Sequence, residues 1–321
     1  MDIMTSSYSD YVIIDVHVHP KRGGRVVIDE ILKIMNEYNI MLSALLARDT
    51  DPDDVNRPEI RKYIISKLVN SYFLQRLDAD DYIHIIEIFE LMRERLGRTV
   101  SNRELASYVS TYPNKFIGLG SINLSKDSEY VKNKLRELDE LGLAGAKFWP
   151  QLQFFNPADS ENFRIVCEHF QRVKKVIMVH TGTAPGPWEI PELSEYANPK
   201  NLEPILKEYD VPIILAHFGY YSATCPGIWF QEALELGKKH TNVWFDVSAV
   251  TYILSNEKLV ERIRRYVGFE RVLFGSDYLE YVKPSIDIIL TSPYLKEEER
   301  RLILGLNAIK LFNLKLRKHS S

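Results

Sequence analysis

The chain is poor in cysteine and has no strong excess of charge of either sign. Its 321 residues include two cysteines, Cys167 and Cys225, which lie far apart and match no metal-binding or redox spacing. We therefore expect no disulfide framework, which favours a reducing compartment. The formal net charge of -3 argues against nucleic acid or an anionic membrane surface as the main partner.

Long apolar runs are also missing. No stretch approaches the length needed to span a bilayer, and residues 1–10 are polar, without the basic-then-apolar pattern of a signal peptide. Hydrophobic residues make up 45% and charged residues 26%, which is ordinary for a globular domain. We therefore expect a cytoplasmic protein that acts on a small molecule and has neither nucleic-acid nor membrane partners.

Residues 11–20 predict a buried β-strand that ends in two histidines, because the segment from Val12 to Val18 contains five β-branched residues. Side chains alternate along a strand, which predicts one face with Asp15, His17 and His19 and the opposite face with Ile14, Val16 and Val18. Two imidazoles two residues apart on a rigid strand can bind one metal ion. An isolated His-x-His pair is equally consistent with chance, so other ligand-type residues must decide.

Seven further segments predict strands, and each is followed by a predicted helix. They begin near residues 40, 116, 144, 176, 212, 243 and 271. Alternating strands and helices predict a parallel sheet, and eight such units predict an α/β fold of the (β/α)8 TIM-barrel type. The site of such a barrel lies at the C-terminal ends of its strands. We therefore interpret residues 1–321 as a single barrel domain.

Residues 51–113 interrupt this rhythm and predict a helical insertion between the second and third strands. Helices are expected over 59–77 and 79–96, and Ser101 and Glu104 have the spacing of a capping box that opens a third helix. The insertion either forms a lid or pocket wall over the site, or simply covers one side of the domain. The basic, glycine-containing residues 21–25 predict a flexible loop.

Polar residues of metal-ligand or acid–base type stand at the ends of five predicted strands. They are His17 and His19 on the first, Lys147 on the fourth, His180 on the fifth, His217 on the sixth and Asp277 on the eighth. Alternation can turn each of them inward; His217, for example, should share its face with Leu215. Chance explains one such residue easily, but a set of six in barrel order indicates a common site.

These stretches resemble the amidohydrolase superfamily, specifically its amidohydrolase-related branch of hydrolases and decarboxylases. The similar segments are Asp15-Val-His-Val-His19, Gly145-Ala-Lys-Phe-Trp-Pro150, Val179-His-Thr-Gly182, Leu215-Ala-His-Phe-Gly219 and Leu273-Phe-Gly-Ser-Asp277. The resemblance runs from about residue 11 to 313, apart from the insertion. Many relatives have histidine where this chain has Trp149, so no mechanism that uses an imidazole there carries over.

The resemblance implies one divalent metal ion, held by His17, His19, His180 and Asp277. Zinc is the expected metal, and manganese, iron or cobalt are alternatives. A bound cation lowers the pKa of water, and Asp277 would take the proton and deliver it to a leaving group. His217 would polarise the substrate or transfer a proton, or else orient a ligand.

Lys147 has three possible roles. Under the resemblance it is either a carbamylated bridge between two metals or a free ammonium that contacts the substrate, and we expect the free ammonium. A salt bridge inside the barrel mouth is the purely structural alternative.

Three arginines are further candidates for substrate binding: Arg22, Arg25 and Arg48, which follow the first two strands. A guanidinium suits a substrate carboxylate, although solvated loop charges are equally consistent.

Trp149 and Trp188 would line the wall of the pocket, or else pack in the core.

The expected activity is hydrolysis of a small ester, lactone or amide, including one that bears a carboxylate, by a metal-activated water. The alternative is metal-dependent, non-oxidative decarboxylation of an aromatic or dienoic acid. A binding protein with a relic site is a third reading, and the complete ligand set argues against it. Relatives are often dimers, so the resemblance also implies a homodimer.

Overall fold

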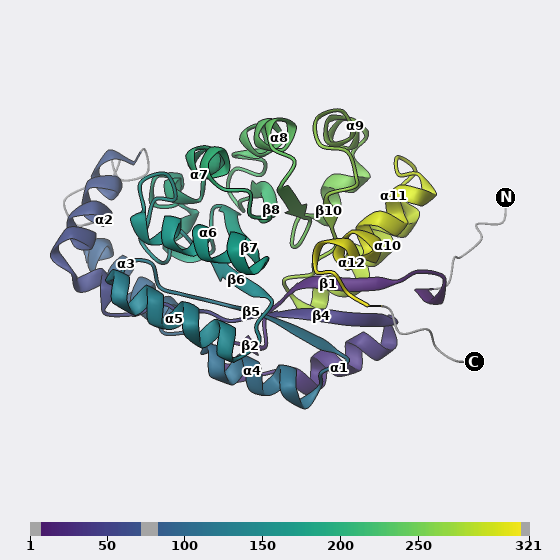
Figure 1. Cartoon of the computed structure of the whole chain (residues 1–321). Coiled ribbons are helices and arrows are strands. Elements are labelled where there is room, and N and C mark those ends of the chain that lie inside the picture. The colour runs from purple at the N-terminus through teal and green to yellow at the C-terminus, as the bar shows by residue number, and fades with distance from the viewer. Residues whose placement is uncertain (1–7, 72–82, 316–321) are drawn as a thin grey trace.

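Eight parallel strands form one barrel in the computed structural model, which describes residues 8–71 and 83–315. The strands follow chain order around the sheet, from β1 through β4, β5, β6, β7, β8 and β9 to β10. A backbone bridge between Val18 and Asp277, and the hydrogen bond from Val16 N to Phe274 O (3.0 Å), join the two end strands. Helices surround the strands (Figure 1), so the predicted (β/α)8 barrel is confirmed.

The strands coincide with the eight segments predicted from the sequence. They are β1 (Ile13–Val18), β4 (Ile40–Leu46), β5 (Phe116–Gly120), β6 (Gly145–Phe148), β7 (Val176–Gly182), β8 (Ile213–Tyr221), β9 (Val243–Asp246) and β10 (Val272–Leu273). The helices that connect and cover them are α1 (Ile28–Glu37), α5 (Ser128–Glu140), α6 (Glu161–Val173), α7 (Glu203–Glu208), α8 (Phe230–Lys239), α9 (Glu257–Tyr266), α10 (Val282–Thr291), α11 (Glu297–Arg301) and α12 (Asn307–Leu311). None of the helices within the described ranges is long and apolar enough to cross a bilayer.

Short helical turns complete the chain. Those of 3-10 type are η1 (Tyr8–Asp10), η2 (Asp54–Asn56), η5 (Gly186–Glu189), η6 (Pro191–Leu193), η7 (Glu195–Ala197), η8 (Pro199–Leu202), η9 (Thr251–Ser255) and η10 (Leu279–Tyr281), and η11 (Leu302–Leu306) is a π-helical turn. Side chains cap several of the helices. Asp127 accepts a hydrogen bond from Tyr130 N at the start of α5, and Ser160 accepts one from Phe163 N at the start of α6.

Two apolar layers hold the strands in place. The interior cluster draws on strands all around the barrel and contains Ile14, Val16, Leu46, Leu119, Val176, Met178, Ile214, Ala216, Trp244 and Leu273. A larger outer cluster lies between strands and helices and includes Phe148, Phe163, Phe218 and Phe245. Burial of this much apolar surface fixes the strands, so polar side chains at their C-terminal ends are presented from a rigid support.

Strict alternation fails on two strands that carry predicted site residues. The register of β1 against β4 shifts after Asp15, and Val16 packs in the interior cluster whereas Val18 packs in the outer one. The prediction that Val16 and Val18 share a face is therefore wrong. On β8, Leu215 belongs to the outer cluster, and the backbone is left-handed at His217 (φ 62°). The shared face predicted for Leu215 and His217 is also wrong, because this backbone turn brings His217 to the site.

Residues 21–26 form a β-hairpin rather than the flexible loop that we expected. Strand β2 (Lys21–Arg22) pairs antiparallel with β3 (Arg25–Val26). Gly23 and Gly24 connect them with φ values of 54° and 83°. Two consecutive residues with positive φ make a tight hairpin turn that suits glycine, which explains why this short basic segment is ordered.

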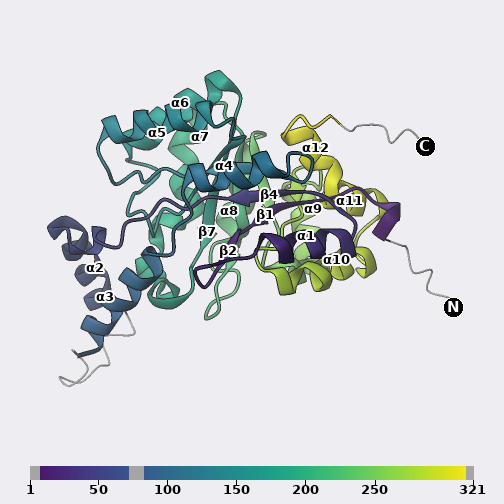
Figure 2. The same cartoon turned by 90° about the horizontal axis from the view of Figure 1, so that it is seen from below.

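Three helices between β4 and β5 form the predicted insertion, namely α2 (Pro58–Asn70), α3 (Ile83–Leu96) and α4 (Asn102–Thr111). Ser101 Oγ accepts a hydrogen bond from Glu104 N (3.1 Å), as the capping-box spacing predicts. The parts of the first two predicted helices that fall on residues 72–82 lie outside the described residues. In Figure 2, α2 and α3 project from one side, whereas α4 runs along the barrel.

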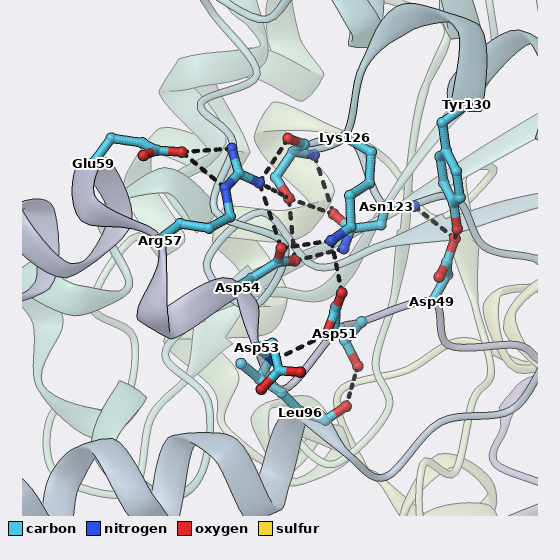
Figure 3. A network of polar contacts seen from close by, with 12 residues as sticks. Asp49, Asp51, Asp53, Asp54, Arg57, Glu59, Leu96, Asn123, Lys126 and Tyr130 are labelled. Carbon is cyan, nitrogen blue, oxygen red and sulfur yellow. Dashed lines mark hydrogen bonds and ion pairs between the residues drawn. The ribbon is translucent and has the colours of Figure 1, made fainter.

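A charged network anchors the start of the insertion to the loop after β5 (Figure 3). The buried Asp54 accepts hydrogen bonds from Asn123 Nδ2 (2.8 Å) and Lys126 Nζ (2.7 Å). Arg57 Nη1 donates to Ser125 O (2.9 Å). Because the buried charge is paired and hydrogen-bonded, this network holds the root of the insertion in one position on the barrel.

Candidate metal centre

A cavity of about 570 Å³ opens at the C-terminal ends of the strands. Its residues include strand ends and the residues that follow them (His17, His19, Arg48, Trp149, His180, His217, Tyr221 and Asp277), the hairpin (Lys21, Gly23 and Gly24) and the end of α3 with its link to α4 (Arg95, Gly97, Arg98, Thr99 and Val100). An ion pair between Lys21 Nζ and Glu104 Oε1 (2.8 Å) ties the hairpin to α4. The insertion therefore supplies part of the cavity wall.

Three of the predicted metal ligands meet in this cavity. His19 Nε2 lies 3.1 Å from Asp277 Oδ1, and His17 Nε2 lies 3.6 Å from the same oxygen. Asp277 reaches this point through a left-handed backbone (φ 66°), and its N donates a hydrogen bond to His17 O (2.9 Å). One ligand atom from each of these residues lies within 4.8 Å of the others, which suits a single cation.

Buried hydrogen bonds fix the tautomer of His17. Asp246 Oδ2 lies 3.0 Å from His17 Nδ1, and Asp246 Oδ1 accepts hydrogen bonds from His217 N and Ser248 N (3.0 Å each). A carboxylate has no hydrogen to donate, so His17 Nδ1 is the donor and Nε2 keeps its lone pair. His17 Nε2 is buried without a hydrogen-bond partner in the described part of the chain. Such an orphaned acceptor beside a carboxylate-supported imidazole fits a metal ion.

A second set of possible ligands comprises His17, His217 and Asp246. In this set the hydrogen on His17 Nδ1 is already donated to Asp246. Burial works against the charge of Asp246, but the interaction with His17 outweighs it and holds the pKa of Asp246 well below its usual range. Because these atoms satisfy one another, the set that contains His19 and Asp277 fits a metal ion better.

His180 lies beside the three converging ligands rather than among them. His180 Nε2 is 2.7 Å from Thr183 O, and His180 Nδ1 is 3.1 Å from His217 Nε2. His217 Nδ1 lies 2.9 Å from Ser248 O. A carbonyl only accepts, so the two facing nitrogens both present lone pairs. Burial lowers the pKa of both imidazoles, and the pair therefore suits a nearby cation; that His180 is the fourth ligand stays a prediction.

Lys147 ends β6 and is completely buried. Its Nζ lies 5.3 Å from the centre of the Trp149 ring and makes no hydrogen bond with any described residue. Burial lowers the pKa of Lys147 to about 8, although the charges of Asp246 and Asp277 raise it. Lys147 is not among the residues that line the cavity, so its ammonium lies beneath the surface that a substrate would touch.

Asp15 and Gly275 hold the ligand-bearing strands together. Asp15 Oδ1 accepts hydrogen bonds from His17 N (3.1 Å) and Ser276 N (3.0 Å), which joins the first and last strands. Burial raises the pKa of Asp15 to about 7 in spite of these hydrogen bonds. A Cβ at Gly275 would lie 2.8 Å from His17 Cβ, so only glycine lets His17 occupy its place.

Two of the predicted substrate-binding residues lie in the cavity wall. Trp149 stacks on His19 with 6.0 Å between ring centres, and Arg48 Cζ lies 6.0 Å from the centre of the Trp149 ring. The structure therefore brings Arg48 and Trp149 to the same wall as the histidines.

Two further residues that were predicted to bind the substrate, Arg25 and Trp188, lie outside the cavity wall. Arg25 is exposed and forms an ion pair with Glu30 (2.6 Å). Trp188 is buried in an apolar cluster between the insertion and the barrel, which is the core packing that the sequence left open. The side chain of Arg22 lies outside the described part of the structure.

Sequence reasoning missed several residues of the site. Asp246 ends β9 two residues after the inward-facing Trp244, so the rule that selects polar strand ends would have found it. Arg95 comes from the insertion, and Tyr221 and Tyr278 follow strand ends; all three line the cavity. No spacing in the sequence marks these three residues.

Comparison with known proteins adds a family context to this geometry. A family model described as Amidohydrolase matches residues 14–314. No curated protein sequence matches the chain. Solved structures with a similar fold include a probable 2-pyrone-4,6-dicarboxylic acid hydrolase from Acinetobacter baumannii with citric acid bound (14% identity, TM-score 0.60, covering 94% of this chain and 99% of that chain).

Two decarboxylase structures share this fold. One is 5-carboxyvanillate decarboxylase from Sphingomonas paucimobilis (15% identity, TM-score 0.60, covering 95% of this chain and 100% of that chain). The other is a dihydroxybenzoic acid decarboxylase from Polaromonas sp. JS666 with bound manganese (14% identity, TM-score 0.57, covering 94% and 97%). At these identities the likeness shows the fold and leaves the reaction to the site.

Proposed function

The chain belongs to the amidohydrolase family, and from this premise we propose that it is a metal-dependent hydrolase of a small ester, lactone or amide. The observation that carries the proposal is the unpartnered lone pair of His17 Nε2, buried beside His19 and Asp277 at the cavity. These three residues would hold a divalent ion, with His180 as a fourth ligand. Imidazole and carboxylate donors suit zinc, and manganese, which one similar structure binds, is an alternative.

A divalent cation at this position would polarise a substrate carbonyl and lower the pKa of water. The protein supplies the proton acceptor. Burial would raise the pKa of Asp277, but its hydrogen bond with His19 and its attraction to His17 lower the pKa well below the usual range. Asp277 is therefore ionised at neutral pH, and it would take a proton from the attacking water and return it to the leaving group.

His217 and Lys147 would stabilise charge on the substrate. The contacts of His217 N with Asp246 and of His217 Nδ1 with Ser248 O fix its ring, and His217 lines the cavity. Its Nε2 presents a lone pair, so the fixed imidazole is suited to accept a proton, and the imidazolium that forms would stabilise negative charge on the substrate. The buried Lys147 places positive charge beneath the cavity floor, where low polarity strengthens its effect on a developing anion.

Non-oxidative decarboxylation is the second candidate. The cationic side chains that line the cavity include Arg48 and Arg95, and they favour a substrate that carries a carboxylate. Two similar structures are decarboxylases. In that reaction carbon must receive a proton, and His217 or Asp277 would take this proton from water and pass it on.

Product analysis in isotopically labelled water separates the two reactions. The metal-loaded protein is incubated with a panel of small lactones, esters, amides and aromatic acids in water that contains oxygen-18 and deuterium. We expect one oxygen-18 atom in the product acid and no carbon dioxide, because hydrolysis adds water across the cleaved bond. If carbon dioxide were released and the product carried deuterium on the carbon that lost it, the activity would be that of a carboxy-lyase and not of a hydrolase. Asp277→Asn is the inactive control.

A further inference from the structure

Resting on the proposed function, we infer that Arg48 and Arg95 form an anion site in the cavity wall, so the substrate carries a second, remote carboxylate besides the group at the metal ligands. Arg48 follows β4 of the barrel, and Arg95 lies in the last turn of α3 in the insertion. The insertion would then be the part of the chain that selects dianionic substrates.

Main-chain pairing brings Arg48 to the C-terminal end of α3, where Arg95 lies. Arg48 N donates to Val100 O (2.9 Å), and Val100 N donates to Arg48 O (3.1 Å). Arg48 Nη2 also donates to Arg95 O (2.6 Å), and the neighbouring Thr50 Oγ1 donates to Leu96 O (2.6 Å). These contacts fix the end of α3 against the barrel, so the position of Arg95 in the wall is built by the fold.

Neither guanidinium has an anionic partner among the described residues. The Nε atoms of Arg48 and Arg95 are buried and make no hydrogen bond there. Nearby arginines are paired: Arg93 with Asp53 (3.2 Å) and Arg98 with Glu94 (2.6 Å). Both side chains are half-buried, and a cation without an anionic partner in such a place costs free energy, so two of them in one cavity wall indicate an anion supplied from outside the chain.

Electrostatics support this placement. Burial lowers the pKa of Arg48 to about 9, and the charges of Arg95 and Arg98 lower it further. Burial also lowers the pKa of Arg95, while Tyr278, Tyr221 and Asp277 act in the opposite direction. Arg95 therefore lies in the field of Asp277, on the cavity side that holds the proposed metal ligands.

Trp149 connects the two ends of the proposed binding site. The Trp149 ring stacks on His19, with 6.0 Å between ring centres, and Arg48 Cζ lies 6.0 Å from the centre of the same Trp149 ring. A substrate that lies along Trp149 would meet the metal ligands at one end and the guanidinium groups at the other.

A purely structural role explains only part of this arrangement. Arg48 Nη2 caps a carbonyl at the C-terminal end of α3, which is a common use of arginine. That role leaves Arg48 Nε without a partner and gives Arg95 no function. A substrate carboxylate would satisfy both groups through charge-assisted hydrogen bonds.

The test uses dicarboxylates as probes of the metal-loaded full-length protein. Calorimetry compares malonate, succinate, glutarate and adipate with the monoamide of each acid. We expect at least one dicarboxylate to bind about 10- to 100-fold more tightly than its monoamide, as for hydrogen bonds to a charged group. In Arg95→Met this preference should disappear while the metal content stays unchanged.

Matched variants separate the outcomes. Arg93→Met removes an exposed arginine from the same helix and should keep the preference, and Arg95→Lys should keep part of it. The anion site would be overturned if Arg95→Met still bound the dicarboxylate more tightly than its monoamide. It would also be overturned if the metal-loaded, unaltered protein showed no such preference for any of the four dicarboxylates. If the unaltered protein bound no metal, that result would instead contradict the proposed function. If Arg95→Met fails to fold, the comparison of Arg95→Lys with the unaltered chain decides.

Discussion

Asp277→Asn is expected to lower the affinity of the protein for zinc by at least about 100-fold, because loss of a mere supporting contact already costs 10- to 100-fold. Asp277 provides the carboxylate oxygen that lies 3.1 Å from His19 Nε2 and 3.6 Å from His17 Nε2. Asparagine keeps the shape and tolerates the left-handed backbone at this position (φ 66°), so the variant should fold. The amide removes the only carboxylate from the proposed ligand set and leaves its imidazoles to hold the metal. Chelator competition measures the affinity directly.

The control is Asp53→Asn, which makes the same chemical change at a side chain that is 70% exposed and pairs with Arg93. Its zinc affinity should equal that of the unaltered protein. Turnover by Asp277→Asn should also fall, by about 10²- to 10⁴-fold at saturating metal, because an amide cannot accept a proton. If the zinc affinity of Asp277→Asn were unchanged, we would instead assign the metal to the alternative ligand set that contains Asp246.

Lys147→Met is expected to raise the free energy of unfolding of the metal-free protein by on the order of 3 kcal/mol at pH 7. The reason is that the folded protein disfavours the buried ammonium: the pKa of Lys147 falls from 10.5 to about 8. A lowered pKa of a base destabilises the folded state most at pH values below 8. The cost decreases between pH 8 and 10.5 and is absent above that range.

The stabilisation by Lys147→Met should therefore be large at pH 7 and small at pH 10.5, while turnover falls because the positive charge beneath the site is lost. Chemical denaturation at a series of pH values measures the difference. Lys126→Met is the opposite control, since Lys126 is paired with Asp51 and Asp54 (2.7 Å each) and its loss should destabilise the fold. A gain that does not change with pH would show that Lys147 carries no ammonium.

The barrel and the general position of the site were predictable because they rest on strong local patterns. Most of the eight strands are short apolar segments between turn signals, and Lys147 and His180 follow the inward parity of their strands. Because parallel strands all end at one rim, polar residues at strand ends had to approach one another.

The remaining details depend on backbone irregularities and on contacts distant in sequence. His217 reaches the cavity through a left-handed backbone, which no alternation rule describes. The support of His17 by Asp246 joins the first and seventh strands of the barrel. Arg95 reaches the wall because Arg48 pairs with Val100 after a helical insertion, a pairing that local propensity does not encode.

Anomalous X-ray diffraction from crystals of the zinc-loaded protein, recorded on both sides of the zinc absorption edge, tests the central claim most directly. We expect one peak at about 2.0–2.2 Å from His17 Nε2, His19 Nε2 and an oxygen of Asp277, the usual distances for zinc with these ligands. A peak bounded instead by His17 Nδ1, His217 and Asp246, or no peak at the strand ends, would contradict the account.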